Sequence, residues 1–278
     1  MNVSVVIASL NSFDTLKESL LKWLQLPINE LIVVDGGSTD GTQEFLKFAG
    51  QSDYRIKFTI DKRSGLSFAR NTGTRLANSP LVLHAGPDNS IPVETLEAMI
   101  DALDSASLVS CRTVVSSGNR YKDMVLNVSK SRLAAGEDLE VVGTPYLALK
   151  ELFSRYPFNE MVRDSDDTFF CEEIRSHGHK IVRLDSVCFE SGFDSIASLK
   201  SRYVRWGRSD AEFYYRRSQE MSLIGRIKSF TRAFWIEVIA PARHSPIALY
   251  LVSLPFLALL GYLRFRAFQA ALSEQGRG

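Results

Sequence analysis

Acidic side chains recur at three places in the chain where a local sequence change marks the start or end of an element. Asp35 and Asp88 each follow a short apolar run, whereas Asp164, Asp166 and Asp167 precede a helical pattern. A carboxylate at a strand end can accept hydrogen bonds from a nucleotide base or a ribose hydroxyl. Another can hold Mg²⁺ or Mn²⁺, which take oxygen ligands from one or two carboxylates and from substrate phosphates. The third group can supply a general base that deprotonates a hydroxyl.

Each acidic group also has a plainer structural explanation. Asp35 stands before Gly36 and Gly37, where an aspartate is commonly a turn residue. Asp88 precedes Pro92 closely enough to belong to an ordinary helix cap, and residues 164–167 can be a solvated helix start favoured by the helix dipole. None of the three groups indicates a functional site by itself. Their order along the chain does.

The elements that must position these residues alternate between strands and helices. Residues 31–34, Leu-Ile-Val-Val, are too few for a helix and are typical of a strand that is buried on both faces. Strands are also predicted over 3–8, 55–60, 81–84, 108–115 and 180–184, with helices between them and a helical pattern over 146–153. This alternation predicts right-handed βαβ units in a mostly parallel sheet flanked by helices. Because parallel strands end at one edge, Asp35 and Asp88 should converge there.

Composition limits the classes of protein that fit. A chain of 278 residues can bury one large α/β core and a modest appendage. From Lys200 onward there are 13 Lys and Arg against 5 Asp and Glu, a net of +8, whereas the 20 basic and 27 acidic residues before it give −7. A basic tail suits lipid headgroups or a substrate diphosphate. No nucleic-acid motif accompanies it, so we expect no nucleic-acid partner.

Cysteine usage and the first residues point to a reducing compartment. Cys111, Cys171 and Cys188 show no paired spacing, which favours buried thiols over disulfides or metal ligands. The N-terminus lacks the basic region of a signal peptide and is interpreted as the first strand of the mature protein.

The C-terminal residues 211–278 predict a helical, membrane-associating extension. Residues 223–240 have an amphipathic pattern, and residues 246–263 contain no charged side chain. A transmembrane helix needs roughly 20 apolar residues, so the second stretch is borderline. Pro255 lies in its middle and arginines flank both ends, so a full span, a re-entrant segment and an in-plane helix all fit. Membrane association is favoured over a buried core hairpin.

Five motifs in this order resemble the glycosyltransferase family 2 enzymes, which have the GT-A fold. They are residues 3–11 (VSVVIASLN), 33–42 (VVDGGSTDGT), 65–73 (GLSFARNTG), 86–89 (GPDN), and 158–160 (FNE) followed by Asp166, Asp167 and Gly178. The resemblance covers about residues 1–210. It implies a GT-A catalytic domain with a nucleotide-sugar half, 1–105, and an acceptor half, 106–210.

The resemblance also implies a role for each matching residue. Those that would bind the nucleotide sugar are Ala8, Ser9, Asn11, Asp35, Gly37, Arg70 and Asn71. Asp88 would ligate a divalent metal, Mn²⁺ or Mg²⁺, that bridges the diphosphate. Asp167, with Asp166 as the alternative, would be the base that activates an acceptor hydroxyl. The segment Arg202-Tyr-Val-Arg205-Trp206 is similar to a motif of processive members that contacts diphosphate and acceptor; a basic amphipathic helix explains it equally well.

Three positions depart from the family pattern. Gly36 replaces the second Asp of the commoner Asp-Asp-Gly-Ser form, and Gly86 replaces the first Asp of Asp-x-Asp, which leaves Asp88 as the lone carboxylate. A histidine often found near the position of Glu190 is absent, which removes a second protein ligand for the metal. His84, His177, His179 and His244 form no metal-ligand pattern and are interpreted as structural or surface residues.

The reaction implied is inverting transfer of a sugar from a nucleoside-diphosphate sugar, with a UDP-sugar favoured, to a lipid-linked or polysaccharide acceptor at the cytoplasmic membrane face. The alternative is a glycosyltransferase-like protein that binds nucleotide sugar or a partner with little or no turnover, which the weakened Asp-x-Asp supports. A nucleotidyltransferase is disfavoured because the chain lacks a basic glycine-rich phosphate loop near its start. A dinucleotide oxidoreductase is disfavoured because no Gly-x-Gly-x-x-Gly follows the first strand.

Overall fold

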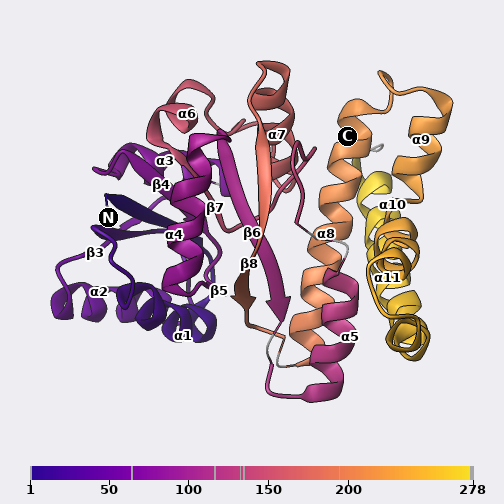
Figure 1. Ribbon diagram of the computed structural model, residues 1–278, viewed down its shortest axis with the longest axis horizontal. Helices are drawn as coiled ribbons and strands as arrows, with labels where there is room; N and C mark the ends of the chain where they lie inside the picture. The colour runs from indigo at the N-terminus through magenta and orange to yellow at the C-terminus, as the bar shows by residue number, and fades with distance from the viewer. Residues whose placement is uncertain are drawn as a thin grey trace. The chain divides into compact units, whose positions relative to one another are not determined.

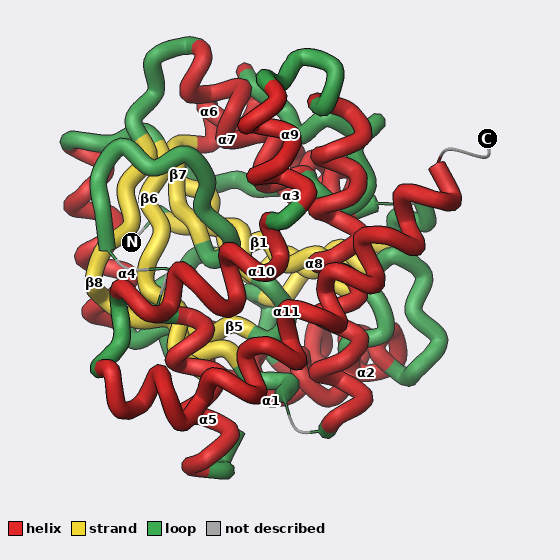
Figure 2. The backbone as a smooth tube through the Cα atoms, turned by 90° about the vertical axis from the view of Figure 1, so that its right-hand side faces the viewer, coloured by secondary structure: helices red, strands yellow, loops and turns green. Residues whose placement is uncertain are grey.

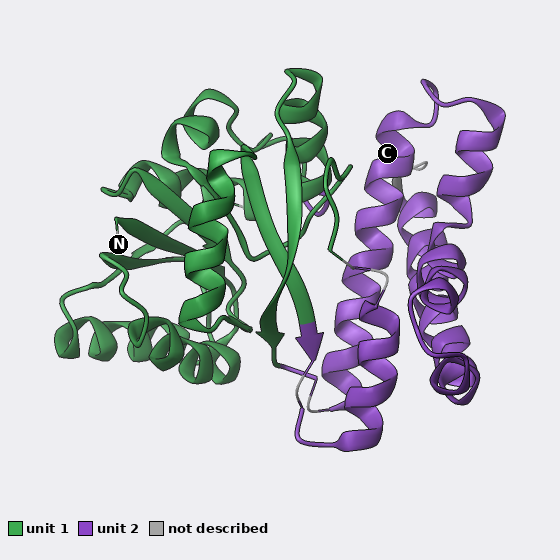
Figure 3. Ribbon diagram, viewed as in Figure 1, with its two compact units in different colours: residues 1–113, 135–162, 166–191 green, residues 114–134, 163–165, 192–278 purple. Residues whose placement is uncertain are grey.

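The computed structural model describes residues 2–63, 65–115, 117–131, 133, 135–193 and 195–275. These residues pack as two compact units (Figure 3). The first unit comprises residues 1–113, 135–162 and 166–191, and the second comprises residues 114–134, 163–165 and 192–278.

The first unit is built on an eight-stranded sheet (Figure 1). Its strands are β1 (Val3–Ser9), β2 (Glu30–Asp35), β3 (Ile56–Ile60), β4 (Leu81–Ala85), β5 (Asn89–Ser90), β6 (Leu108–Val115), β7 (Tyr146–Leu149) and β8 (Ile181–Glu190). They lie in the order β3-β2-β1-β4-β7-β6-β8-β5. Strands β3, β2, β1 and β4 are mutually parallel, β7 is antiparallel to β4 and to β6, and β5 is antiparallel to β8. The predicted α/β sheet is confirmed, with antiparallel pairing at β7 and β5.

Helices cover both faces of this sheet because its central strands are apolar on both sides. The helices of the first unit are α1 (Phe13–Leu24), α2 (Thr42–Ser52), α3 (Leu66–Leu76), α4 (Val93–Asp101), the short η1 (Ala102–Asp104), α6 (Lys150–Arg155) and α7 (Asp166–Ser176). Val5 and Ile7 of β1 pack with α1, α2 and α4, whereas Val6 and Ala8 pack with α3, α6 and α7. Helix α3 approaches β1 closely at Gly73, where a Cβ atom would lie 2.2 Å from Val6 Cγ1.

The register of the parallel strands brings their carboxyl ends to one edge. Ser9 of β1 pairs with Asp35 of β2, and Ile7 of β1 pairs with Ala85 of β4. Asp35 and the turn after β4 are therefore at the same level of the sheet, as the sequence predicted. This edge is where open α/β sheets bind ligands.

The helical pattern predicted over residues 146–153 is wrong in its first half. Residues 146–149 form β7, which pairs with β4 through Tyr146 and His84, and α6 begins only at Lys150. A place between two strands of a sheet satisfies the backbone of β7 and buries Tyr146, Leu147 and Ala148. Tertiary pairing outweighs local helical preference for such a short segment.

The second unit is helical in the part that the structure describes, apart from the end of β6. Its helices are α5 (Arg120–Lys130), α8 (Ile196–Arg217), α9 (Leu223–Phe230), α10 (Arg232–Phe234), the π-turn η2 (Trp235–Ile239), η3 (Ala240–Arg243) and α11 (Ile247–Gln275). Figures 1 and 2 show α8 and α11 side by side, and these two helices pack more extensively than any other pair of elements. One described helix, spanning Ile247–Glu274, is long and apolar enough to cross a membrane.

The amphipathic pattern of residues 223–240 forms broken helices instead of one continuous helix. Thr231 separates α9 from α10, and its hydroxyl donates to the Ile227 carbonyl at 2.8 Å. At the far end, Pro241 lies in η3. A side-chain bond to the preceding turn and a proline both disturb regular helix geometry, which accounts for the breaks.

Candidate active site

Asp35 shapes the turn that follows β2. Its Oδ1 accepts hydrogen bonds from the backbone N–H groups of Gly37 (2.9 Å) and Ser38 (2.8 Å) and from the Gln43 amide (2.9 Å). Its Oδ2 accepts from the Ser38 hydroxyl at 2.5 Å. Asp35 is fully buried, and Gly37 adopts φ of 95°, a conformation that favours glycine. These contacts are those of a turn-forming residue, and a direct contact with a base or ribose stays a prediction.

Two hydrogen bonds of Asn11 connect the loop after β1 to this turn. Asn11 donates its N–H to Ser38 Oγ at 2.7 Å, and its Oδ1 accepts from the Thr39 N–H at 2.9 Å. Asn11 has φ of 48°, which asparagine tolerates better than most residues. Ser9 is 4% exposed, and its Oγ has no hydrogen-bond partner among the described residues. A buried hydroxyl at the strand edge that lacks a partner is a candidate ligand contact.

Asp88 lies in the tight turn between β4 and β5. Asn89 Oδ1 accepts from the Gly86 N–H at 2.7 Å, and the Ser191 N–H donates to the Asp88 carbonyl at 2.9 Å. The Asp88 carboxylate lies directly over Gly86, where a Cβ would come within 2.5 Å of Asp88 Oδ1. The glycine that replaces the first Asp of Asp-x-Asp thus leaves space for this partly buried carboxylate.

No three His, Cys, Asp or Glu side chains gather as a metal-ligand group in the part of the chain that the structure describes. The donor set nevertheless fits Mg²⁺ or Mn²⁺, because these ions commonly bind through one carboxylate together with substrate phosphates. Glu190 also belongs to this corner of the sheet, since it pairs with Asn89 across β5 and β8. The sequence analysis marked this position only as the place of an absent histidine, and the antiparallel pairing shows that a carboxylate, Glu190, lies beside the Asp88 turn.

Arg70 and two aspartates form a buried charge cluster. The Arg70 guanidinium, on α3, is ion-paired with both Asp166 and Asp167 at the start of α7. The Tyr146 hydroxyl donates to Asp167 Oδ1 at 3.1 Å, and the rings of Tyr146 and Phe158 lie 5.6 and 5.2 Å from the Arg70 carbon Cζ. Arg70 was predicted near the nucleotide and diphosphate; its contacts instead hold the acidic pair, and the predicted ligand contact stays untested.

The two aspartates differ in their exposure. Asp166 has 2% of its side chain exposed, whereas Asp167 has 28%. Among the described residues, Asp167 Oδ1 bonds to Arg70 and Tyr146, and Oδ2 makes no hydrogen bond. A second oxygen of Asp167 can therefore meet a substrate hydroxyl, and the buried Asp166 is poorly placed to do so.

Burial shifts the pKa values of the groups around this cluster. It raises the pKa of Asp166 to about 7, against the opposing charge of Arg70 and with the help of the Asp167 charge. Burial also raises the pKa of Tyr146 well above its ordinary value, so its hydroxyl stays a donor. His84 Nε2 lies 3.0 Å from Thr74 Oγ1, and burial together with Arg70 lowers the pKa of His84 well below 6.5. His84 is therefore a neutral core residue, as predicted from its lack of a metal-ligand pattern.

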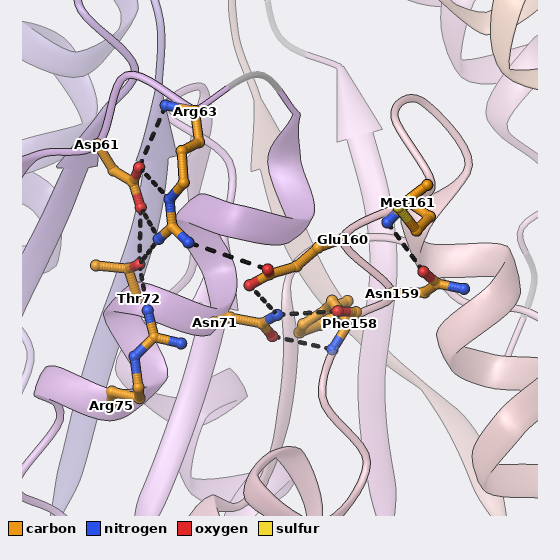
Figure 4. A network of polar contacts seen from close by, with 9 residues as sticks. All are labelled: Asp61, Arg63, Asn71, Thr72, Arg75, Phe158, Asn159, Glu160 and Met161. Carbon is orange, nitrogen blue, oxygen red and sulfur yellow. Dashed lines mark hydrogen bonds and ion pairs between the residues drawn. The ribbon is translucent and has the colours of Figure 1, made fainter.

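Asn71 joins α3 to the segment before α7 (Figure 4). Its amide accepts from the Phe158 N–H at 2.9 Å and donates to the Phe158 carbonyl at 2.9 Å and to Glu160 Oε1 at 3.1 Å. Figure 4 also shows Arg63 between Asp61 and Glu160. The Asn71 contacts are structural, and its predicted contact with substrate stays untested.

The remaining predicted residues belong to the second unit. Arg202 is buried with its Cζ 4.3 Å from the centre of the Phe193 ring, and Arg205 is exposed. Trp206 packs edge-on against Tyr203 at 4.8 Å, with Lys130 Nζ 5.0 Å from its ring centre. These contacts match the amphipathic-helix explanation, and a role in binding diphosphate or acceptor stays a prediction.

Asp164 belongs to the second unit. Its N–H donates to Glu212 Oε2 at 2.8 Å, and those of Arg163 and Ser165 donate to the same carboxylate. Burial and the Glu212 charge raise the pKa of Asp164.

Tyr146 is the contact that sequence reasoning missed in the acidic cluster. It was assigned to a helix, and no motif marks it. Only the pairing of β7 with β4 brings its hydroxyl to Asp167.

A family model supports the identity of the chain. Residues 4–157, more than half of the chain, match the model of glycosyl transferase family 2. The chain is 30% identical over 92 residues to glycosyltransferase GlyA of Streptococcus pneumoniae, a match covering 33% of this chain and 12% of that protein. It is 33% identical over 100 residues to cholesterol galactosyltransferase of Borreliella burgdorferi, covering 35% and 28%. These matches span well under two thirds of the curated relatives.

Solved structures share the fold. Mannosyltransferase PcManGT of Pyrobaculum calidifontis, solved with GDP-Man and Mn²⁺, has a TM-score of 0.64 at 19% identity, covering 98% of this chain and 84% of that one. S. aureus TarS 1–349, solved with UDP-GlcNAc, has a TM-score of 0.54 at 15% identity, covering 100% and 92%. Motif order, sheet topology and these likenesses agree, and the chain belongs to glycosyl transferase family 2 and is a glycosyltransferase of the GT-A fold.

Proposed function

We propose that the chain transfers a sugar from a nucleoside-diphosphate sugar to an acceptor hydroxyl with inversion at the anomeric carbon. The catalytic domain comprises about residues 1–210. The single observation that carries the proposal is Asp167, which Arg70 and Tyr146 hold by one oxygen while the other accepts no hydrogen bond among the described residues. A carboxylate that is held in place through one oxygen, and whose other oxygen can accept a proton, suits a general base.

The nucleotide is proposed to bind over the ends of β1 and β2. The buried Ser9 hydroxyl supports this, as do the shaped turns around Asn11 and Gly37. In this proposal Ala8 and Ser9 border the base, and Asp35 holds the turn that receives the ribose. PcManGT was solved with GDP-Man and TarS with UDP-GlcNAc, so a nucleotide sugar is the donor class. A UDP-sugar remains our favoured donor.

Asp88 is proposed to ligate Mn²⁺ or Mg²⁺ together with the donor diphosphate. Its support is a carboxylate in a tight turn at the carboxyl-end edge, beside β5. When bound, such an ion neutralises charge that develops on the departing diphosphate.

In the reaction, the acceptor oxygen attacks the anomeric carbon while the bond between that carbon and the β-phosphate oxygen breaks. The nucleoside diphosphate leaves with the bonding electrons, and Asp167 takes the acceptor proton. Arg70 and the Tyr146 hydroxyl hold the Asp167 carboxylate in place, and the buried Asp166 pairs with the same guanidinium. Arg202, Arg205 and Trp206 are proposed to contact diphosphate and acceptor.

The acceptor is proposed to be lipid-linked or polysaccharide, at the cytoplasmic face of a cell membrane. The basic C-terminal residues and the apolar helix α11 support this location.

A donor screen tests the proposal. Release of nucleoside diphosphate is measured from a panel of UDP- and GDP-sugars with Mn²⁺, with Mg²⁺ and with a chelator. We expect one donor to be turned over with either metal and little release after chelation. Asp88→Ala should abolish the metal-dependent part of donor binding, measured by calorimetry, whereas Asp104→Ala, a matched surface carboxylate, should not. Undiminished Mn²⁺-dependent binding by Asp88→Ala would remove the metal assignment.

A further inference from the structure

Helix α11 has two faces of different character. Its buried side chains recur every three or four residues, at Ser253, Leu257, Leu260, Arg264 and Phe268. On the opposite face Leu251, Val252, Leu259 and Tyr262 are 57%, 56%, 49% and 49% exposed. No charged residue occurs between Ile247 and Leu263, and the exposed face first becomes charged at Arg266. The face is therefore apolar along residues 247–262 and polar beyond them.

The segment from α9 to η2 packs along α11 and exposes apolar side chains of its own. The Phe230 ring lies 5.5 Å from Phe265 and 5.4 Å from Phe268, and Phe234 lies 5.3 Å from Phe265. These contacts place the 223–239 segment along α11. The large apolar side chains that this segment exposes are Leu223, Ile224, Ile227, Phe230, Trp235 and Ile239. So many large apolar side chains exposed on one short segment are uncommon unless another surface covers them.

The buried face of α11 packs against α5 and α8, two helices that contain many charged residues. Leu257 packs with Val125 and Val128 of α5, and Leu260 packs with Leu199 and Tyr203 of α8. A Cβ on Gly207 would lie 2.3 Å from the Arg264 carbonyl oxygen, so α8 and α11 touch backbone to backbone. Helix α8 contains eight charged residues. An α11 that crossed a bilayer would either draw α5 and α8 into the hydrocarbon or separate from them.

Arg264 makes that separation costly. Its guanidinium donates to Asp210 of α8 at 2.6 and 3.0 Å and to Glu237 of η2 at 2.8 Å. The Ser129 hydroxyl of α5 donates to Glu237 at 2.7 Å. All three charged side chains are buried, and separating α11 would take the Arg264 cation away from both Asp210, which also pairs with Arg232 at 3.3 Å, and Glu237.

Charge decides which surface covers the apolar face. Residues 221–275 contain six Lys and Arg but two Asp and Glu, and Arg264 and Glu237 neutralise each other inside. Arg226, Lys228, Arg243 and Arg266 are exposed on or next to the apolar segments, with Arg243 Cζ 5.8 Å from the Trp235 ring centre. Anionic headgroups complement these cations, whereas a second copy of the same face would bring like charges together.

We propose that α9, η2 and residues 247–262 of α11 form a monotopic membrane-binding surface that lies in the plane of an anionic bilayer. Helix α11 does not cross the membrane. Its apolar face enters the headgroup boundary, and the flanking cations meet lipid phosphates. This inference concerns how the chain meets lipid, and it holds whether or not the proposed transfer occurs.

Vesicle binding tests the surface. The full chain is sedimented with vesicles of equal parts phosphatidylcholine and phosphatidylglycerol, and with phosphatidylcholine alone, without donor sugar. We expect binding to the anionic vesicles, and we expect Leu251→Glu with Leu259→Glu to weaken it about tenfold or more. The matched control, Gln269→Glu with Ser273→Glu, adds the same charge on the exposed face beyond residue 262 and should weaken binding far less. Thermal unfolding by circular dichroism confirms that each variant is folded.

The proposal would be overturned if both double variants weakened vesicle binding equally. It would also be overturned if the wild-type chain bound neither kind of vesicle. Sedimentation equilibrium showing a dimer that Leu251→Glu dissociates in the absence of lipid would overturn it as well.

A labelling experiment tests the topology. His244→Cys and Ser273→Cys place single thiols near the two ends of α11, and the native cysteines are buried. Protein is bound to sealed anionic vesicles from outside and treated with a membrane-impermeant maleimide, with the parent chain as background. Both variants should label fully, because an in-plane helix keeps its ends on one side. Protection of one end until detergent is added would show that α11 spans the bilayer.

Discussion

Asp166 and Asp167 are adjacent residues of the same type, but their side chains differ in exposure to solvent. Both pair with Arg70, but one faces the interior and the other reaches the surface. Burial favours the protonated form of Asp166, with a pKa of about 7, whereas the resemblance named Asp167 as the base with Asp166 as the alternative. This difference in exposure is the reason that we propose Asp167, and not Asp166, as the base.

Replacing each aspartate should therefore have a different effect. Asp167→Asn should lower kcat about a hundredfold or more while donor binding stays nearly unchanged, because only the proton acceptor is lost. Donor turnover and calorimetric binding measure the two effects. Glu173→Gln, on the exposed face of the same helix, is the control and should retain full turnover. If Asp167→Asn still turns over and Asp166→Asn does not, the base is Asp166.

Asp166 should also make stability depend on pH. Its pKa is raised from 3.8 to about 7 by burial, so the folded chain binds this proton more tightly than the unfolded chain. The contribution to the free energy of unfolding is fully present below about pH 4 and is lost as the pH rises towards 7. Urea unfolding below and above this window should show a shallower fall for Asp166→Asn than for the parent chain. An unchanged slope would show that Asp166 ionises normally.

Glu30 should have the opposite pH dependence. Burial opposes its ionisation, but hydrogen bonds from the Asn78 N–H (2.6 Å), Lys57 and Ser4 (2.6 Å) outweigh it and lower its pKa to about 2. The stability it supplies is present above pH 4.5 and is lost as the pH falls towards 2. Glu30→Gln should cost about 1–3 kcal/mol of unfolding free energy at neutral pH. Glu18→Gln, which breaks an exposed pair with Lys22, should cost less than about 1 kcal/mol.

Among the elements, α8 and α11 approach each other closely at Gly207, where a Cβ would lie 2.3 Å from the Arg264 carbonyl oxygen. Gly207→Ala would press a methyl group against the Arg264 carbonyl oxygen and should destabilise the chain by about 1–3 kcal/mol. Gly50→Ala in α2 is the control, since its Cβ would have an ordinary 3.6 Å contact. That change should stabilise by about 0.5–1 kcal/mol, because alanine favours helix. Equal unfolding free energies for the two variants would contradict the close contact.

Element boundaries divide into those set by local sequence and those set by pairing. Residues 31–34 were predicted as a buried strand, and β2 contains them, because a short β-branched run has no other stable place. The mistaken helix at residues 146–149 shows the converse, since strand pairing with β4 lies outside any local window. The break at Thr231 is local in origin, because the Thr231 hydroxyl bonds to the Ile227 carbonyl of the preceding turn.

At the scale of the whole molecule, α11 is both core and membrane surface. Deleting residues 244–275 would remove the apolar contacts that α11 makes with α5 and α8, and it would take the Arg264 cation from the buried Asp210 and Glu237. The deletion should therefore lose helical structure, measured by far-ultraviolet circular dichroism, and not simply release a folded protein from lipid. A truncated chain that retains the helicity expected from α5 and α8 would show that α11 is only an anchor.

Ionic strength should modulate how the molecule partitions to lipid. Exposed cations beside an apolar face contribute an electrostatic attraction that is screened over about 10 Å at 0.1 M salt. Cosedimentation with phosphatidylglycerol vesicles should weaken as salt rises but persist at high salt, because apolar burial is not screened. Complete release by salt would mean that the apolar face does not enter the bilayer.

The sequence by itself determined the α/β alternation, the order of the five motifs, the family they resemble and the asymmetry between an acidic body and a basic tail. These features are local or additive, so they can be counted along the chain. Only the tertiary structure decided that Arg70 pairs with Asp166 and Asp167, that Tyr146 joins them, and that α11 packs on α5 and α8. Each of these depends on contacts between residues far apart in the chain, and such contacts leave no periodic trace in the sequence.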